Sequence, residues 1–445
     1  MSGTFSLPAT PPTQQRWAGK RSLTPFALIG IALALRVGWV LYSWAAGGAE
    51  FAYPDEDVHW QLARNLVQHG WLITDDGRLA ARMPAYPLFL ALFAGLGTSG
   101  VLVARLAQAV VGAATVGVAW RLADDTCGRR AAWVAGILTA LDPFAVFFAN
   151  LLLTEGLFTL IVVALTACAW RAVRSPKLDS APPSLAPFAG VALLGAAAVM
   201  TRPSSALYLP LLWLVLLCLA HDRRRALTRL ALCPVLLAVL MLPWGLRNCV
   251  ALGSCAWLST NGGATLYDAQ GPQADGSSNQ NFLRELPELR GLDEVALDRK
   301  LRQMAVEQMK SDPARVLRLA AVKLLRTWSP TPNVPEYRHS RAGYVGAAYT
   351  LVVLIGAAAG LLRSLVLRRR RAEAASPNDS VPVARLQALL WLPVVYFTVL
   401  HCVYIGSLRY RVPLMPLLAL VAASAVAAGR TAGAAHQDVR RGKPA

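Results

Sequence analysis

The sequence predicts an all-α polytopic membrane protein, a bundle of about ten or eleven membrane-spanning helices with a helical loop region outside the membrane. Composition is the first observation behind this prediction. The 445-residue chain is 55% hydrophobic and only 16% charged, whereas a soluble domain carries about 25% charged residues. The second observation is a mean hydropathy of +0.43, which is high for a soluble protein. The third observation is that the apolar residues form runs close to the ~20 residues that cross a bilayer.

Ten apolar runs are separated by polar or charged segments. One of them, 186–201, is shorter than the others, and an additional apolar stretch at 84–97 is either re-entrant or an eleventh span. The first run exceeds the 7–15 residues or so of a signal-peptide core, so we expect it to remain as a helix. The nine longer runs are 24–46, 99–121, 130–150, 153–173, 203–220, 226–246, 343–362, 383–403 and 411–429.

Basic residues predict the orientation of the chain, because Lys and Arg gather on the cytoplasmic side of membrane proteins. With ten spans, every basic cluster falls on one side together with both termini. These clusters explain most of the net charge of +19 as topology anchors, without a nucleic acid partner. They are Arg16/Lys20/Arg21, Arg121/Arg129/Arg130, Arg171/Arg174/Lys177, residues 221–225, residues 363–371 and Arg430/Arg440/Arg441/Lys443.

Two long segments are predicted to lie on the outer side, 47–83 and 247–341. They divide the chain into an N-terminal transmembrane module (1–246, with the first outer segment), an outer loop domain (247–341), C-terminal spans (342–430) and a cytoplasmic tail (431–445). The outer loop domain has signals for two helices, from Asp293 to about Lys310 and from Asp312-Pro313 to Trp328. The second alternates apolar and basic positions, which is typical of a helix at the membrane surface.

The seven cysteines include no Cys-x-x-Cys pair and no Cys/His cluster with zinc spacing, so a thiolate metal site is not indicated. Cys249 and Cys255 fall in the same outer loop and are candidates for a disulfide. Their proximity in sequence does not establish the bridge geometry, so two free thiols are the alternative.

Three acids follow the first span in Tyr53-Pro54-Asp55-Glu56-Asp57-Val58-His59-Trp60. Proline followed by acids indicates the start of a helix, where the helix dipole stabilises ionised carboxylates. The simpler interpretation is the acidic first turn of a surface helix. The functional one is a general base placed beside a lipid-borne electrophile.

Ionisable residues also occur within or at the ends of the apolar runs, where charge is costly and often functional. The alternative is that they pair with one another as structural ion pairs. They are Arg36, Arg105, Glu155, Arg202 and His401.

Two arginine-containing motifs lie at predicted outer ends of spans, Pro243-Trp244-Gly245-Leu246-Arg247-Asn248 and Arg409-Tyr410-Arg411-Val412-Pro413. Arginines are less expected on the outer side, and a guanidinium binds two phosphate oxygens at once, so these motifs favour an anionic ligand. Anchoring by Trp244 and Tyr410 in an aromatic belt is the competing interpretation.

The order of these motifs resembles the GT-C superfamily of integral membrane glycosyltransferases. It is most similar to the glycosyltransferase family 39 branch, with the protein O-mannosyltransferases and lipid A aminoarabinose transferases. Each motif is common by itself, and the ordered set over about 50–415 carries the resemblance. The departures are a third acid, Asp57, and His59-Trp60 where the family often has a tyrosine. The matching motifs are Asp55-Glu56, Ala63-Arg64-Asn65-Leu66, Gly70, Arg82-Met83-Pro84-Ala85-Tyr86-Pro87, Leu153-Thr154-Glu155, Thr201-Arg202-Pro203, Pro243-Trp244 with Arg247-Asn248, Asn261-Gly262-Gly263, the helix from Asp312-Pro313 to Lys323, and Arg409-Tyr410-Arg411-Val412-Pro413.

The resemblance implies a GT-C-type helical bundle that acts as an inverting glycosyltransferase. The donor would be a polyprenyl-phosphate-linked sugar, used at the outer face of the cytoplasmic (inner) membrane. The acceptor, whether lipid A, a protein or a glycan, is not identified, and neither is the sugar.

The resemblance also implies roles for individual residues. Asp55 is the expected catalytic base, with Glu56 supporting it and Glu155 orienting the acceptor or a cation. Some relatives hold a divalent metal near the acid pair, and Asp55, Glu56 and His59 would be its ligands here. The expected substrate-binding residues are Arg82, Tyr86, Arg202, Arg247, Asn248, Arg409, Tyr410 and Arg411. Of these, Arg247, Arg409 and Arg411 would neutralise the lipid phosphate as the bond breaks.

Two other functions fit a polytopic protein. A transporter or lipid-linked sugar flippase often shows repeated halves with broken helices in corresponding positions, and no such symmetry is visible here. An O-antigen ligase or polymerase would ordinarily have a large outer loop rich in Arg and His, and no acid pair after the first span.

Overall fold

The computed structural model describes residues 24–174, 185–373 and 377–427, and in these residues every regular element is a helix. The predicted basic residues in 1–23, at Lys177 and in 428–445, and with them the tail 431–445, lie outside the described residues. The α helices are α1 (Thr24–Gly47), α2 (Pro54–His69), α3 (Ala85–Ala94), α4 (Thr98–Cys127), α5 (Arg129–Ala140), α6 (Pro143–Phe148), α7 (Glu155–Val173), α8 (Ala186–Thr201), α9 (Tyr208–Leu219), α10 (Arg223–Leu230), α11 (Leu232–Leu252), α12 (Gly262–Gln270), α13 (Phe282–Glu285), α14 (Glu294–Ser311), α15 (Pro313–Trp328), α16 (Pro335–Arg338), α17 (Arg341–Glu373), α18 (Pro377–Val403) and α19 (Met415–Ala423). Short 3₁₀ helices are η1 (Pro203–Ser205), η2 (Pro287–Leu289), η3 (Leu408–Leu414) and η4 (Ser424–Val426).

The described residues form a multi-span helical membrane protein, as the sequence predicts. Seven helical segments are long and apolar enough to cross a bilayer: Pro25–Gly47, Thr98–Cys127, Glu155–Val173, Arg223–Leu252, Arg341–Leu367, Ala384–Val403 and Leu408–Val426. Three shorter apolar helices accompany them, Ala85–Ala94, Ala186–Thr201 and Pro203–Leu219.

Two apolar stretches differ from a simple span. The ten residues of α3 extend about 15 Å, half of the ~30 Å hydrocarbon layer, so the stretch 84–97 does not cross as one helix. The run 130–150, which the sequence predicts as one span, is two helices. The Asp142 carboxylate accepts the backbone N–H groups of Phe144 and Ala145 and so starts α6 after α5 has ended.

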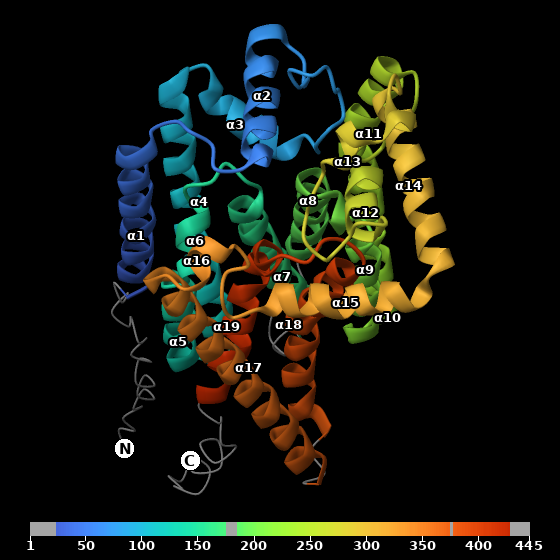
Figure 1. The fold of residues 1–445 in the computed structure, drawn as a ribbon. Helices are drawn as coiled ribbons and strands as arrows, with labels where there is room; N and C mark the ends of the chain where they lie inside the picture. The colour runs from blue at the N-terminus through green and yellow to red at the C-terminus, as the bar shows by residue number, and fades with distance from the viewer. Residues whose placement is uncertain (1–23, 175–184, 374–376, 428–445) are drawn as a thin grey trace, which may run out of the picture.

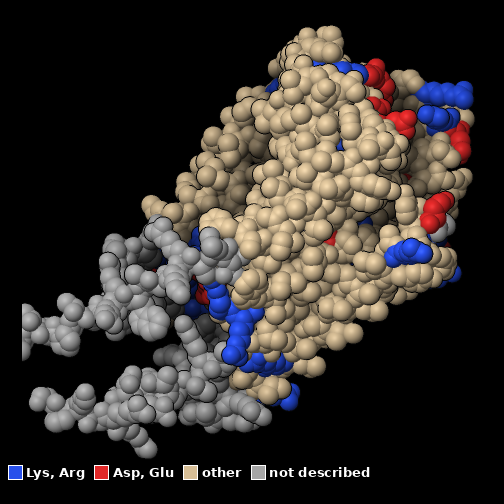
Figure 2. Space-filling model, turned by 90° about the vertical axis from the view of Figure 1, so that its left-hand side faces the viewer, with Lys and Arg blue, Asp and Glu red and all other residues tan. Residues whose placement is uncertain are grey.

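The helices pack around α4, which contacts α1, α5 and α7. In Figure 1, α2 lies at one end of the molecule, whereas α1 begins and η4 ends toward the other. Helix α15 runs crosswise to the bundle in the same view. On the face shown in Figure 2, a broad area carries almost no charged residue, and Lys, Arg, Asp and Glu gather at its margins. An uncharged band between charged margins is what a bilayer-embedded surface requires.

Two arginines inside the spans hold helix ends instead of pairing with carboxylates. Arg36 is buried and donates to the carbonyls of Thr139 and Ala140 at the end of α5. Arg105 donates to the carbonyls of Gly48 and Glu50 after α1, at 2.9 and 2.8 Å. The last carbonyls of a helix have no intrahelical donor and carry partial negative charge. Of the two interpretations of Arg36 and Arg105, the structure does not show the structural ion pair, because their terminal nitrogens bind backbone carbonyls.

Of the two possibilities for Cys249 and Cys255, the structure shows the disulfide. It joins the last turn of α11 to the turn that follows, where Gly253 has a positive φ of 62°. Glycine adopts this left-handed conformation without steric cost.

Candidate active site

Asp55 lies between two arginines that come from distant parts of the chain. It stands in the first turn of α2. Its Oδ1 accepts a hydrogen bond from Arg82 Nη2 at 2.7 Å, and its Oδ2 accepts one from Arg409 Nη1, also at 2.7 Å. Arg409 is 354 positions away in sequence. The first outer segment and the Arg409 motif therefore meet at Asp55.

Arg409 also binds a second carboxylate. Its Nε lies 2.5 Å from Glu155 Oε1, and Arg202 Nη2 lies 2.7 Å from the same oxygen. Glu155 is fully buried, and its other oxygen, Oε2, has no hydrogen-bond partner among the described residues. We call Asp55, Arg82, Glu155, Arg202 and Arg409 the ion cluster. Three guanidinium groups and two carboxylates leave it with one positive charge in excess.

Local sequence places the two inner members of the cluster at helix ends. Glu155 is the first residue of α7, where the helix dipole favours a negative charge. Arg202 has extended backbone at the end of α8, because the following Pro203 disfavours a helical conformation in the residue before it. The Arg202 Nε also donates to Thr154 Oγ1 at 2.8 Å, which joins the end of α8 to the start of α7.

Burial alone raises the pKa of Asp55, but the positive charges of Arg82 and Arg409 outweigh it and hold the pKa well below its usual range. His59, one turn further along α2, has its pKa lowered to about 3 by burial, with Arg82 acting in the same direction. The imidazole is therefore uncharged at neutral pH, and its Nδ1 has no hydrogen-bond partner among the described residues.

Glu56 holds the backbone instead of facing the cluster. Its Oε1 accepts the N–H groups of Ala52 and Tyr53 at 3.0 and 3.1 Å, and its Oε2 accepts that of Leu152 at 2.8 Å. These bonds tie the start of α2 to the linker before α7, which brings Asp55 and Glu155 to the same arginine. The structure therefore favours a positioning role for Glu56 over the catalytic role expected from the resemblance.

The expected metal ligands do not fit a cation site. Both oxygens of Asp55 face guanidinium groups, and both oxygens of Glu56 accept backbone N–H groups. The charged groups that act on His59 are Arg82 and Arg409 together with Asp55 and Glu155, which already pair with these arginines. Within residues 24–174, 185–373 and 377–427, no group of three or more His, Cys, Asp or Glu side chains is placed to hold a metal.

Two aromatic residues border the cluster. Tyr86 is fully buried, donates to Gln108 Oε1 at 2.7 Å, and its ring meets that of His59 edge-on. Tyr410 stacks on His401 with ring centroids 3.8 Å apart, and Arg409 lies over the Tyr410 ring. No pattern in the sequence indicated Gln108, which lies in the middle of α4.

Arg411 does not join the cluster. Its guanidinium donates to the Ser329 carbonyl at 2.5 Å and to Thr350 Oγ1 at 3.0 Å, and it lies over the ring of Phe144. In a 3₁₀ helix with about three residues per turn, side chains two positions apart point in different directions. Arg409 and Arg411, both in η3, therefore cannot face the same site.

Arg247 and Asn248 are also outside the cluster. Arg247 donates to the carbonyls of Leu72 and Leu79 at 2.7 and 2.6 Å, and Asn248 donates to that of Ala256 at 2.7 Å. The expectation that Arg247 neutralises a phosphate conflicts with these contacts, because its terminal nitrogens already bind carbonyls.

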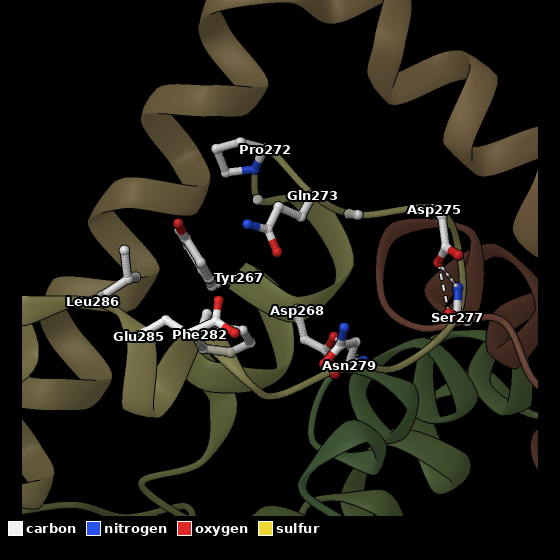
Figure 3. Close-up of a pocket in the computed structure, with 12 residues that line it drawn as sticks. Tyr267, Asp268, Pro272, Gln273, Asp275, Ser277, Asn279, Phe282, Glu285 and Leu286 are labelled. Carbon is white, nitrogen blue, oxygen red and sulfur yellow. Dashed lines mark hydrogen bonds between the residues drawn. The ribbon is translucent and has the colours of Figure 1, made fainter.

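A separate cavity of about 180 Å³ lies in the second outer segment, between α12, α13 and the loop after α12 (Figure 3). Its wall includes Asp268, Asp275 and Glu285 and no Lys or Arg. Asp268 accepts hydrogen bonds from Ser278 Oγ and Asn279 N–H, and Asp275 accepts from Ser277. With this charge the cavity disfavours an anionic ligand.

Comparison with solved structures identifies the class of fold. The oligosaccharyltransferase AglB from Archaeoglobus fulgidus, in complex with an inhibitory peptide and a dolichol-phosphate, aligns with a TM-score of 0.53 at 14% identity. The alignment covers 95% of this chain and 52% of that one. The apo form of the Archaeoglobus fulgidus oligosaccharyltransferase aligns with a TM-score of 0.54 at 12% identity, over 91% and 50% of the two chains. This chain therefore spans about half the length of those proteins, and it has the GT-C fold that the sequence predicts.

The family comparison agrees with the fold. Residues 81–245 match the family model described as dolichyl-phosphate-mannose-protein mannosyltransferase. That segment includes Arg82, Glu155 and Arg202 of the ion cluster. ArnT from Cupriavidus metallidurans in the apo state aligns at 16% identity with a TM-score of 0.41, over 90% of this chain and 77% of that one. No curated protein matches the sequence.

Because Glu56 accepts three backbone N–H groups, its replacement should lower the stability of the protein. In Glu56→Gln, an amide NH₂ replaces one acceptor oxygen, so at least one of the N–H groups of Ala52, Tyr53 and Leu152 loses its partner. We expect a loss of about 1–3 kcal/mol, seen as a lower midpoint of thermal unfolding in detergent. The matched control is Asp57→Asn on the same helical turn, because Asp57 is exposed and bonds only Gln61. Equal midpoints for the two variants would contradict the positioning role.

Proposed function

We propose that this chain is an inverting glycosyltransferase that takes a sugar from a polyprenyl-phosphate-linked donor and transfers it to an envelope acceptor. The reaction would occur at the outer face of the cytoplasmic membrane, with the chain termini on the cytoplasmic side. The observation that carries the proposal is the ion cluster, in which a carboxylate of the first outer segment shares Arg409 with a buried carboxylate at the start of a span.

The charge and the place of the cluster suit a lipid-borne phosphate. The excess positive charge favours an anion, and arginine is well suited to phosphate. Glu155 opens a membrane-spanning segment, and Arg409 lies at the start of another. A phosphate at this depth would be attached to a lipid whose chain stays in the bilayer. The AglB structure was obtained with dolichol-phosphate, which agrees with a carrier of this class.

The proposed chemistry is a displacement at the anomeric carbon. The acceptor oxygen forms a bond to this carbon while the bond from the carbon to the phosphate oxygen breaks, and the acceptor proton moves to Asp55. The phosphodiester of the donor leaves as a phosphate monoester with one more negative charge. Arg409 and Arg202 would stabilise that charge as it develops.

The ion pairs of Asp55 suggest how the base becomes active. A carboxylate held by two arginines is a weak base, since both positive charges favour its ionised form. A donor phosphate would compete with Asp55 for Arg409, and Asp55 would then keep only Arg82 and become more basic. The donor would therefore bind before the acceptor proton is removed. The Oε2 of Glu155 is an acceptor suited to a substrate hydroxyl group, and the Nδ1 of His59 accepts or donates according to the tautomer of its ring.

No described contact favours the alternative of a transporter or flippase. Such a protein needs ionisable groups along a path through the bilayer. The terminal nitrogens of Arg36 and Arg105, which lie within spans, are bound to helix-end carbonyls.

Replacing the proposed base should abolish transfer. We expect Asp55→Asn to lower the rate by about 100- to 10,000-fold, because the amide cannot accept the acceptor proton. The measurement is mass spectrometry of envelope glycans and glycolipids in a deletion strain that carries the variant. The control is Asp57→Asn, which removes an exposed acid from the same turn and should restore the lost product. Full activity in Asp55→Asn, with the protein present in the membrane, would end the proposal.

The two arginines of η3 should differ in donor binding. Arg409→Ala removes a guanidinium from the cluster and should weaken binding of undecaprenyl phosphate, used as the probe, by about tenfold or more. Arg411→Ala should leave this affinity near that of the wild type and lower the thermal midpoint instead, because its partners lie outside the cluster. Binding is measured by native mass spectrometry of the purified protein. An equal loss of affinity in both variants would rule out a specific role for Arg409.

The proposed orientation can be tested by labelling. In a background without the five free cysteines, Gln273→Cys places a thiol on an exposed position of the second outer segment. It should react with a membrane-impermeant maleimide in intact cells. Arg121→Cys, in α4 near its predicted cytoplasmic end, should react only after permeabilisation. The reverse pattern would overturn the orientation.

A further inference from the structure

The segment that carries Arg82 has no regular structure of its own. Residues 71–84 connect α2 to α3 without a helix or strand, yet Arg82 near the end of this segment meets Asp55 at 2.7 Å. Other parts of the chain must therefore hold the segment in place.

The holding contacts come from the second outer segment and converge on two residues. Glu294 accepts the N–H of Leu79 on Oε2 at 3.0 Å and the N–H of Ala80 on Oε1 at 3.1 Å. Arg247 Nη1 donates to the Leu79 carbonyl at 2.6 Å, and Thr260 N–H donates to the Ala80 carbonyl at 2.9 Å. All four polar groups of this dipeptide are thus bound by residues more than 160 positions away.

Glu294 is placed for this task by the helix that begins with it. It is the first residue of α14, where the helix dipole stabilises its carboxylate. Helix α14 is fixed against α12, because Gly263 N–H donates to Asp298 Oδ1 at 2.5 Å and the two backbones approach so closely that Gly263 has no space for a Cβ. The carboxylate therefore projects from a rigid support.

The same support reaches the other arginine of Asp55. At the end of α12, Gln270 donates to the Val403 carbonyl at 2.5 Å, and Lys323 of α15 donates to the same carbonyl at 2.9 Å. Arg326 donates to the carbonyl of Gly406 at 3.3 Å, three residues before Arg409. The second outer segment thus holds both chain segments whose arginines bind Asp55.

We propose that Glu294 is a positioning residue of the active site, which fixes Leu79 and Ala80 so that Arg82 reaches Asp55. The proposal rests on the proposed function, in which Asp55 is the base. The groups that face Asp55 are Arg82, Arg409, His59 and Tyr410. Only Arg82 depends on the Leu79–Ala80 backbone, so loss of Glu294 would weaken one ion pair of Asp55 and leave Arg409 in place.

The test variant is Glu294→Ala in the full chain, purified in detergent or nanodiscs. Backbone amides of residues 72–82 should exchange hydrogen several-fold faster than in the wild type. Transfer should fall about 10- to 100-fold, while affinity for undecaprenyl phosphate stays unchanged, because Arg409 still binds the phosphate. When Arg82 no longer holds Asp55, one of the two positive charges that lower the pKa of Asp55 is weakened, so this pKa rises. Since Asp55 must be ionised to accept a proton, the fall of the transfer rate on the acid side should move to higher pH. Glu294→Gln, which keeps one acceptor oxygen, should restore part of the rate.

The control is Glu307→Ala, an exposed glutamate on the same helix that bonds only Gln303. It should match the wild type in exchange, affinity and pH profile. Unchanged exchange of residues 72–82 in Glu294→Ala overturns the inference, whether or not the protein is a transferase. Faster hydrogen exchange in Glu294→Ala with an unchanged acid limb of the transfer rate also overturns it. Glu294 would then have a structural role only. Failure of the proposed function shows itself separately, as full activity of Asp55→Asn.

Discussion

The sharing of Arg409 between Asp55 and Glu155 is the interaction on which the rest of the site depends. Charges at the edge of a bilayer are costly to remove from water, and breaking a buried pair leaves an uncompensated charge. The guanidinium therefore holds the start of α2, the start of α7 and η3 at one point. Arg82 and Arg202 complete the arrangement and leave it short of one negative charge. The excess positive charge of the cluster favours an anionic ligand.

Seven arginines among the described residues illustrate two different kinds of partner. Arg36, Arg105, Arg247 and Arg315 bind backbone carbonyls at helix ends or in loops. They satisfy polar groups that have no water partner within or beside the bilayer. Arg82, Arg202 and Arg409 bind carboxylates. A phosphate can compete for an arginine of the second group without unfolding a helix end, which is why the second group is the better candidate for substrate binding.

The all-helical bundle and most of its spans could be predicted from the sequence, because the length of an apolar run is a direct requirement of the bilayer. The prediction of a single span over 130–150 was wrong, because Asp142 caps a new helix within this run. For the site, the sequence indicated Asp55, Glu155, Arg202 and Arg409, each an ionisable residue at a helix end or span boundary. It ranked Arg247 and Arg411 beside them, because residue type and spacing do not show where a guanidinium points.

Hydropathy and charge along the sequence determined that this is a multi-span membrane protein. They also indicated the ionisable residues that are candidates for an active site. The physical reason in each case is the cost of exposing polar groups to lipid. The tertiary structure decided which of those residues meet. The pairing of Asp55 with Arg409 depends on helix packing between the two ends of the chain. The support that Glu294 gives to Arg82 depends on a side chain reaching a backbone 214 positions away. Neither leaves a periodic signal, because each is set by the direction of a few side chains in the folded chain.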